Sequence, residues 1–580
     1  MDEIYTVSLS TLLDNDIKFT GGEKEWTPWR MKYPDEVGGC LNRIAKAVSK
    51  QWDIPLKRKY WYGLEGEGYG PDAPDLCVIP LTYPVKTGND LDNLLLDVPW
   101  SKLMVLADCF STSPFIDLVR NTFIHQENRL FIIALLFDYF TLNIYIHDRS
   151  GIVKSSVEDV IENKKDFLRF AIGVLFVEEK YLGFDPSMEE IDGRRYIYVN
   201  PSPSESPVKL EIKKTISRQN GTHSEGTTLW LAQGCLKDKD DINGTIEREF
   251  IVKDFWSVVI DGSKGRKISE RLEETGYTSH IVSWECIGES TGMVRDGGKK
   301  YYFSALDRCW FDESPSLPDN REHIRIVTST IGELVDDLKT SEELLTTFLN
   351  LFLMIIDLYT DHGILIRDIS KDNLLLVETP NGRRQIRLID CHLAVDVVGD
   401  QLTRPYGTAA YMAIDALLRY RYEEKSFRYR YYHDLESVFY VLLWILLERK
   451  LKWYEERGEN LSALRDKSDI LGIWDTSKPD DMVKTIKTVY IKNSIYFVRS
   501  DILDPPAPEF KYLTEYVKKL HRLLLFVDRF SSDDDERTSS REDELYNRNI
   551  QDVRERIISI HAEALITEVE STEGTGDKLT

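Results

Sequence analysis

The chain has 580 residues, 42% of them hydrophobic and 30% charged, which is the composition of a globular protein with room for roughly two to four domains. Its formal net charge of −24 argues against nucleic acid or an anionic membrane surface as a partner. Its seven cysteines are scattered and form no Cys-x-x-Cys pair, which argues against a zinc site or a disulfide framework and favours a reducing, intracellular compartment, either cytoplasm or nucleus.

The N-terminal 200 residues are predicted to contain a hairpin and a helix. No apolar run approaches the roughly 20 residues that span a bilayer, and the first residues lack the basic start and apolar core of a secretory signal. Residues 129–147 alternate as in a β-hairpin that turns near residues 140–141 and ends at His147-Asp148-Arg149-Ser150-Gly151. Residues 157–177 have helical spacing, and the Ser/Pro-rich residues 201–207 are the best candidate for a domain boundary.

A β-rich region follows from about residue 208 to residue 260. Strands are predicted at residues 212–216, 228–232 and 249–252. Lys253 ends the third strand, in a sequence similar to the Val-Ala-Ile-Lys element whose lysine holds nucleotide phosphates. Residues 265–275 are predicted to be a helix, and its Glu270 is our candidate partner for that lysine. Gly226 and Thr227 belong to a degenerate phosphate loop between the first two strands, where an ordinary hairpin turn explains the glycine nearly as well.

Residues 363–395 carry the strongest functional signal. Asp368 and Asp390 each follow an apolar run, and Asn373 lies five residues after Asp368. This is the Asp-x-x-x-x-Asn spacing of a phosphoryl-transfer catalytic loop, followed by a metal-binding aspartate. Asp368 can orient an attacking hydroxyl and accept its proton, whereas Asn373 and Asp390 offer the hard oxygen ligands that Mg²⁺ prefers.

The segments around this loop are predicted to be regular. Residues 341–360 have helical spacing, with Thr340 and Glu343 as a capping box, and residues 374–377 and 385–389 form a hairpin. Residues 407–415 resemble the end of a kinase activation segment, in which Thr408 contacts the catalytic loop. Asp434 is predicted to cap a buried apolar helix over residues 438–447 and to hold the backbone of the loop.

Taken together, these segments resemble the fungal-type protein kinase family, a divergent branch of the protein kinase superfamily. The resemblance covers roughly residues 120–450. It is carried by IHDRSG (146–151), EGTTLW (225–230), FIVKDFW (250–256), REHIRIV (321–327), GILIRDIS (363–370), LIDCHLA (388–394), GTAAYMA (407–413) and YHDLESVFYVLLWI (432–445). It implies a protein kinase-like fold, ATP with Mg²⁺ as cofactors, and transfer to Ser or Thr of a protein substrate. Arg367 would then pair with a phosphorylated activation segment.

The chain also departs from kinase patterns. Ile366 stands where His usually precedes Arg-Asp, His392 ends the Asp-Phe-Gly element, and the lysine common two residues after the catalytic aspartate is Ser370, with Lys371 next to it. These departures and the degenerate phosphate loop keep open a pseudokinase that acts as a binding or scaffold module. A small-molecule phosphotransferase is the third reading, although the segment from Gly407 and the HDLE sequence at residues 433–436 argue against it.

The predicted fold is therefore α+β and two-lobed. Residues 1–200 form an N-terminal family-specific extension, of which residues from about 120 to 200 are expected to pack on the small lobe, with a separate domain core as the alternative. Residues 208–335 form the small lobe and hinge, and residues 336–530 form the helical large lobe. Residues 531–580 contain an acidic loop, a terminal helix and a tail.

Overall fold

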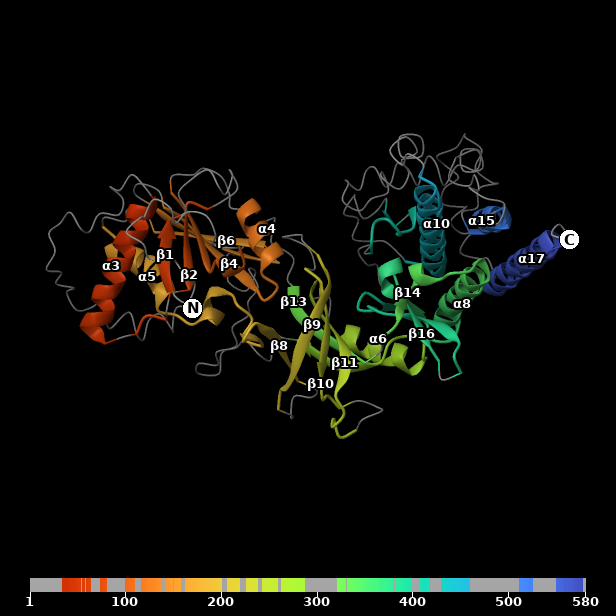
Figure 1. The fold of residues 1–580 in the computed structure, drawn as a ribbon, viewed down its shortest axis with the longest axis horizontal. Coiled ribbons are helices and arrows are strands. Elements are labelled where there is room, and N and C mark those ends of the chain that lie inside the picture. The colour runs from red at the N-terminus through yellow and green to blue at the C-terminus, as the bar shows by residue number, and fades with distance from the viewer. Residues whose placement is uncertain are drawn as a thin grey trace. The chain divides into compact units, whose positions relative to one another are not determined.

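The computed structural model of the protein divides into two compact units (Figure 1). The first unit comprises Met1–Ile260 and Ile281–Ser329, and the second unit comprises Asp261–His280 and Thr330–Thr580. Both contain helices and β-sheet, so the fold is mixed α+β as predicted. The structure describes residues 34–53, 55–57, 59–63, 74–80, 100–109, 116–137, 141–149, 151–157, 162–200, 206–219, 226–237, 242–258, 262–286, 321–329, 331–379, 381–397, 407–414, 416–417, 429–458, 511–524 and 549–576.

In the residues that the structure describes, a six-stranded sheet and three α-helices form the N-terminal part of the first unit. The strands are paired in chain order, and only β3 and β4 run parallel. Their bounds are β1 (Lys59–Gly63), β2 (Leu76–Pro80), β3 (Val105–Cys109), β4 (Phe131–Phe137), β5 (Leu142–Asp148) and β6 (Gly151–Val157). The helices are α3 (Pro34–Trp52), which lies along β1 and β2, α4 (Ile116–His125) and α5 (Lys164–Ala171) (Figure 1).

Strand β4 explains why both faces of this sheet are covered. Its sequence FIIALLF is apolar throughout, and successive side chains of a strand point to opposite faces. Phe131, Ile133 and Leu135 therefore pack with α3 and α5, whereas Ile132 and Ala134 pack with α4. The hairpin predicted for residues 129–147 is confirmed as β4 and β5. The helix predicted for residues 157–177 is too long, because Val157 completes the pairing of β6 and only α5 and a short 3-10 turn follow.

A second sheet of seven antiparallel strands completes the first unit, in the order β12-β13-β11-β10-β9-β8-β7. The strands are β7 (Met188–Ile191), β8 (Arg194–Val199), β9 (Val208–Arg218), β10 (Thr228–Gly234), β11 (Arg248–Val258), β12 (Ile281–Cys286) and β13 (Arg321–Thr328). The three strands predicted between residues 208 and 260 lie in β9, β10 and β11.

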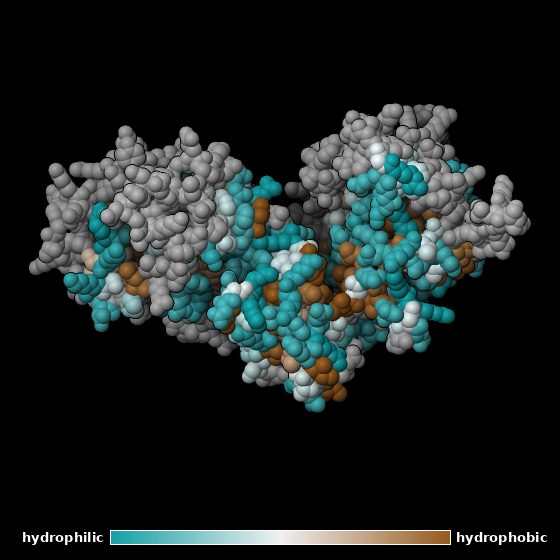
Figure 2. Space-filling view, in the orientation of Figure 1, coloured by the Kyte–Doolittle hydropathy of each residue, from teal (hydrophilic) through white to brown (hydrophobic). Residues whose placement is uncertain are grey.

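The boundary predicted at residues 201–207 falls inside this sheet. Strands β8 and β9 on its two sides are hydrogen-bonded neighbours, with Val199 opposite Val208. The chain therefore does not divide into compact units there, and residues 201–205 themselves lie outside the described ranges. On the face shown in Figure 2, hydrophilic residues dominate the described surface, with smaller hydrophobic patches among them. The exposed large hydrophobic side chains of the first unit include Ile216, Ile242 and Ile246.

The second unit is mostly helical. The helices in its described residues are α6 (Gly262–Glu274), α8 (Ser341–Thr360), α10 (Tyr431–Glu456), α15 (Lys511–Leu524) and α17 (Ile550–Gly576), and α8 packs against both α10 and α17. Its short strands are β14 (Glu333–Leu334), β15 (Ile364–Leu365), β16 (Leu374–Glu378), β17 (Arg384–Leu388) and β18 (Val395–Asp396). The acidic residues 531–540 lie outside the described ranges.

Helix α8 has the predicted bounds and the predicted cap. The Glu343 N–H donates to the Thr340 hydroxyl at 3.1 Å, and the Thr340 N–H donates to the Glu343 carboxylate at 3.3 Å. Within the described residues, α8 is long and apolar enough to cross a membrane by length and composition alone. Nine of its side chains are buried in the core of the second unit, as expected of a central helix in a globular protein.

Candidate functional site

Asp434 of α10 holds the backbone of the loop between β15 and β16. The buried carboxylate of Asp434 accepts hydrogen bonds from the N–H groups of Ile366 (2.8 Å) and Arg367 (2.9 Å). The backbone of Arg367 has φ of +72°, a left-handed conformation that is costly for a residue with a Cβ. The prediction that Asp434 holds this loop is confirmed. Its predicted role as an N-cap is wrong, because α10 begins at Tyr431 after the cap residue Arg430.

Burial raises the pKa of Asp434 to about 6, although the two backbone hydrogen bonds and Arg367 lower it, so most of the carboxylate is ionised at neutral pH.

The backbone of the same loop also explains why a glycine occurs downstream, at position 407. Gly407 has φ of +139°, and a Cβ there would lie 2.8 Å from the Arg367 carbonyl oxygen. Only glycine therefore fits where the GTAAYMA segment passes the loop.

The carboxylate of Asp368 is oriented from two sides. Its Oδ1 accepts from the N–H and the hydroxyl of Thr408, each at 2.8 Å, which confirms the predicted contact. Its Oδ2 accepts from Nδ2 of Asn373 at 3.1 Å, and the same Nδ2 donates to the Asp368 carbonyl at 3.1 Å. The residue is half-buried. A half-buried carboxylate fixed in this way can orient a hydroxyl group and accept its proton.

Asn373 and Asp390 supply oxygen atoms of the kind that Mg²⁺ prefers. The Ile389 N–H donates to the Asn373 carbonyl at 2.9 Å, which brings the start of the next segment beside the loop. Because Nδ2 of Asn373 points to Asp368, its amide oxygen lies on the other side of the side chain. The Asp390 side chain is 15% exposed, and its Oδ1 pairs with Nδ1 of His392. Asn373 and Asp390 could therefore hold a magnesium ion, with phosphate oxygens as its further ligands.

Two basic residues of the loop have partners inside the second unit. The Arg367 side chain is buried, and the Tyr429 hydroxyl donates to its carbonyl at 3.4 Å. The Lys371 ammonium lies 2.9 Å from the Glu448 carboxylate and 3.0 Å from that of Asp336. Burial lowers the pKa of Lys371, but these two carboxylates raise it overall. Lys371 therefore braces the loop against α10 instead of extending beside Asp368.

The first unit holds Lys253 and the described part of the predicted phosphate loop. Lys253 lies on β11, between β10 and β13, with its side chain 8% exposed and its Nζ 4.4 Å from the centre of the Phe255 ring. Gly226 has φ of +57°, and Thr227 is buried with its carbonyl accepting the Gln219 N–H at 2.8 Å. Residues 220–225 of this loop lie outside the described ranges.

Glu270 lies on α6 in the second unit. Its side chain is 61% exposed and pairs with Arg266 on the same helix at 3.1 Å. Glu273 is less exposed, at 18%, and its carboxylate pairs with Nδ1 of His280 at 2.5 Å. Because Lys253 belongs to the first unit, its pairing with a glutamate of α6 stays a prediction.

Sequence reasoning missed two supports of this site. The Glu436 carboxylate accepts from the Ile414 N–H at 2.8 Å and from the Tyr440 hydroxyl at 2.6 Å, which ties the end of the GTAAYMA segment to α10. The pairing of Asp390 with His392 was also unforeseen. The sequence did contain a signal for the role of Glu436, because this residue lies in the same HDLE sequence as Asp434. Only the fold shows that the backbone group it accepts from is the Ile414 N–H.

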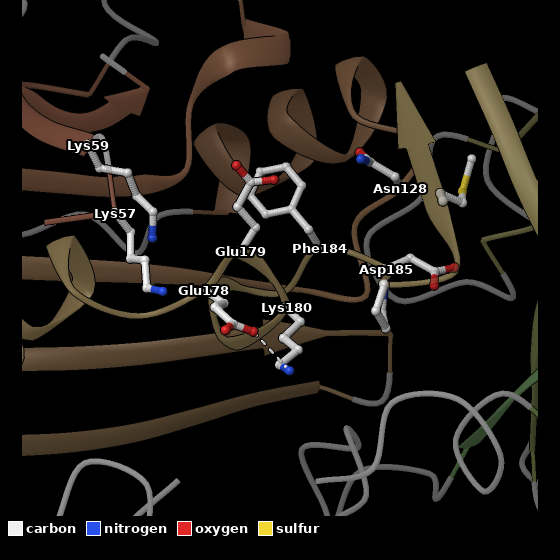
Figure 3. Close-up of a pocket in the computed structure, with 10 residues that line it drawn as sticks. Lys57, Lys59, Asn128, Glu178, Glu179, Lys180, Phe184 and Asp185 are labelled. Atoms are coloured by element: carbon white, nitrogen blue, oxygen red, sulfur yellow. Dashed lines mark ion pairs between the residues drawn. The ribbon is translucent and has the colours of Figure 1, made fainter. Parts of the chain in front are cut away.

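A pocket of about 390 Å³ lies elsewhere in the first unit (Figure 3). Its lysines, Lys57, Lys59 and Lys180, are accompanied by Glu178 and Glu179. Lys59 is buried and donates to the Val174 carbonyl at 3.3 Å, and burial lowers its pKa to about 8. With Asp185, which also lines the pocket, the three acidic residues match the three lysines in number, and none of the predicted site residues lines it.

Comparison with known proteins agrees with the motifs. A family model described as fungal protein kinase matches residues 112–446, which is more than half of the chain. The resemblance predicted from the sequence is thereby confirmed. No curated protein matches the chain closely enough to count as a relative.

Proposed function

The chain belongs to the fungal protein kinase family, and from this membership we propose that it is an active, ATP-dependent kinase that phosphorylates Ser or Thr of protein substrates inside the cell. In this proposal the seven-stranded sheet corresponds to the small lobe of a kinase, and the helical second unit corresponds to the large lobe. The two-lobed arrangement is part of the proposal.

The proposal rests mainly on the set of hydrogen bonds that fixes the Asp368 carboxylate. Thr408 and Asn373 hold its carboxylate, and Asp434 holds the backbone that presents it. A substrate hydroxyl would donate to this carboxylate, which would orient it toward the γ-phosphate and take up its proton. The new ester bond to the γ-phosphorus would form as the bond from that phosphorus to the β–γ bridging oxygen breaks, with ADP as the leaving group. Lys253 would hold the α- and β-phosphates.

The donor set for a metal supports the same chemistry. Bound by Asn373 and Asp390, Mg²⁺ would offset charge on the phosphate oxygens. The chain's own contribution is to fix these two ligands, through the hydrogen bond from Asn373 to Asp368 and through the backbone bond between Ile389 and Asn373.

One observation favours a pseudokinase as the second candidate. Oδ1 of Asp390 is engaged by His392, at the position where the Asp-Phe-Gly element normally ends in glycine. If that pairing persists, Asp390 has one oxygen fewer for a metal. The chain would then bind nucleotide weakly or without turnover.

Phosphate transfer from radiolabelled ATP, with and without Mg²⁺, tests the proposal, with mapping of autophosphorylated residues to separate Ser and Thr from Tyr. Asp368→Asn should lower the rate about 10²-fold or more with little change in ATP affinity. Asp390→Asn should abolish the Mg²⁺-dependent transfer. Asp361→Asn, an exposed aspartate at the end of α8, is the matched control and should behave as wild type. A wild-type chain that binds ATP without transfer would favour the pseudokinase.

A further inference from the structure

The turn between β5 and β6 places a buried arginine beside Gly226, just before β10 of the seven-stranded sheet. Arg149 lies in the HDRSG sequence, which none of the catalytic roles above explains. Its side chain is 5% exposed, and its guanidinium carbon lies 4.1 Å from the centre of the Phe123 ring on α4. The Asp148 carboxylate accepts the Gly151 N–H at 3.1 Å and closes the turn that carries it.

Arg149 lies directly against the β9–β10 turn. A Cβ added to Gly226 would meet the Arg149 side chain at 2.5 Å from Nε and 2.8 Å from Cζ. Gly226 also has φ of +57°, which favours glycine independently. Any side chain at this glycine would therefore displace the guanidinium of an arginine from the N-terminal part of the same unit.

A second contact secures the base of this turn to the same helix. Arg218, the last residue of β9, donates to the Ile124 carbonyl at 2.7 Å and to the Phe123 carbonyl, at the C-terminal end of α4. The turn is closed by the hydrogen bond between Gln219 and Thr227. Phe123 therefore supports the turn twice, with its ring under Arg149 and its carbonyl on Arg218.

The arginine is also a cation at neutral pH. Burial, and next the charges of Arg218 and Arg321, lower the pKa of Arg149 to about 10, while Asp148 raises it. A buried positive charge beside Gly226 attracts an anionic group, such as a phosphate, to this end of the turn.

We propose that Arg149 is a positioning residue for nucleotide binding, which holds Gly226 and Thr227, at the start of β10, in the conformation that receives the phosphates. The six-stranded sheet, through its β5–β6 turn and α4, thereby sets the affinity for ATP. The inference rests on the proposed function, because it assigns the phosphates to this turn.

Binding of Mg²⁺-ATP to the full-length chain, measured by calorimetry, tests it. If loss of Arg149 leaves the competent turn populated about one tenth of the time, Arg149→Ala raises the apparent Kd for ATP about tenfold. KM for ATP should rise by the same factor while kcat changes little, and hydrogen exchange of the Gln219 amide should quicken. Arg149→Lys, which keeps the charge but not the planar stack, should recover only part of the affinity.

Arg129→Ala is the matched control for a general loss of stability. Arg129 is equally buried and also lies 4.1 Å from a phenylalanine ring, that of Phe184. Its guanidinium donates to the Leu182 and Met104 carbonyls, and no contact links it to the β9–β10 turn within the described residues. Its removal should lower the thermal midpoint and leave ATP affinity unchanged.

Gly226→Ala perturbs the same contact from the glycine side. It keeps the inference testable even if Arg149→Ala does not fold. Its methyl group should weaken ATP binding, and Arg149→Ala in the same chain should relieve part of that loss, which a double-mutant cycle measures. The inference is overturned if wild type binds ATP and Arg149→Ala binds it equally well, or if Arg129→Ala weakens binding as much. A wild-type chain that binds no ATP refutes the proposed function itself, which distinguishes the two failures.

Discussion

Arg325 is the residue whose removal should destabilise the first unit most clearly. Its side chain is fully buried on β13, and the guanidinium uses its whole set of N–H donors. Nε and Nη2 donate to the Asp254 carboxylate at 2.7 and 2.6 Å, and Nη2 also donates to Asp185 at 2.9 Å. Nη1 donates to the Ser187 hydroxyl at 2.6 Å and to the Tyr198 carbonyl at 3.2 Å. One side chain thus joins β13, β11, β8 and the segment before β7.

The substitution Arg325→Met keeps a long side chain and removes the charge. Asp254 and Asp185, whose side chains are 8% and 2% exposed, are then left as buried carboxylates without their cation. Removing one partner of a buried ion pair costs about 3–5 kcal/mol. At about 2–4 °C per kcal/mol for a large domain, the thermal midpoint of the first unit should fall by roughly 6–20 °C.

Differential scanning calorimetry of the full-length chain measures this shift. Arg384→Met is the control, because Arg384 forms a more exposed pair with Glu333 at 3.3 Å and should cost about 1 kcal/mol or less. Adding Asp254→Asn and Asp185→Asn to Arg325→Met removes the stranded charges and should restore part of the midpoint. A midpoint for Arg325→Met within a degree of wild type, or a loss as large for Arg384→Met, would refute the assignment of the stability to this ion cluster.

Three further predictions concern the pH dependence of the Arg325 cluster, the loop held by Asp434 and the strands before residue 207. Burial raises the pKa of Asp254, but Arg325 and, after it, His323 together lower it to about 2, so its stabilising contribution is present above pH 4 and lost as the pH falls toward 2. This amounts to about 2 kcal/mol, and thermal midpoints at pH 5 and pH 2.5 should show it in wild type but not in Arg325→Met. Asp434→Ala leaves two buried N–H groups without an acceptor and should destabilise the second unit by about 2–6 kcal/mol in chemical denaturation, with loss of phosphate transfer; an unchanged midpoint would contradict the role of Asp434. A chain that starts at Pro207 lacks β7, β8 and three partners of Arg325, namely Asp185, Ser187 and Tyr198. It should therefore be less soluble than the full chain. Equal solubility and equal thermal midpoints would show that those partners are dispensable.

The catalytic segment could be predicted from the sequence because its signals are local. The helical spacing and cap of α8, the β16–β17 hairpin and the five-residue interval from Asp368 to Asn373 are each set by residues that are close in the chain. The contact of Thr408 with Asp368 spans 40 residues, yet it followed from the family resemblance, which carries the fold's long-range pairing with it.

The tertiary structure alone decided which distant groups meet. Glu436 lies in the same HDLE sequence as Asp434, but nothing in that pattern indicates that its carboxylate accepts the Ile414 N–H, 22 residues upstream. Residues 201–207 resemble a linker by composition, although the strands on both sides pair. Gly226 reads as a phosphate-loop glycine, whereas its neighbour is Arg149, far upstream in the chain. A local pattern records the conformation that a segment prefers, and only packing determines which side chain from elsewhere fills the space beside it.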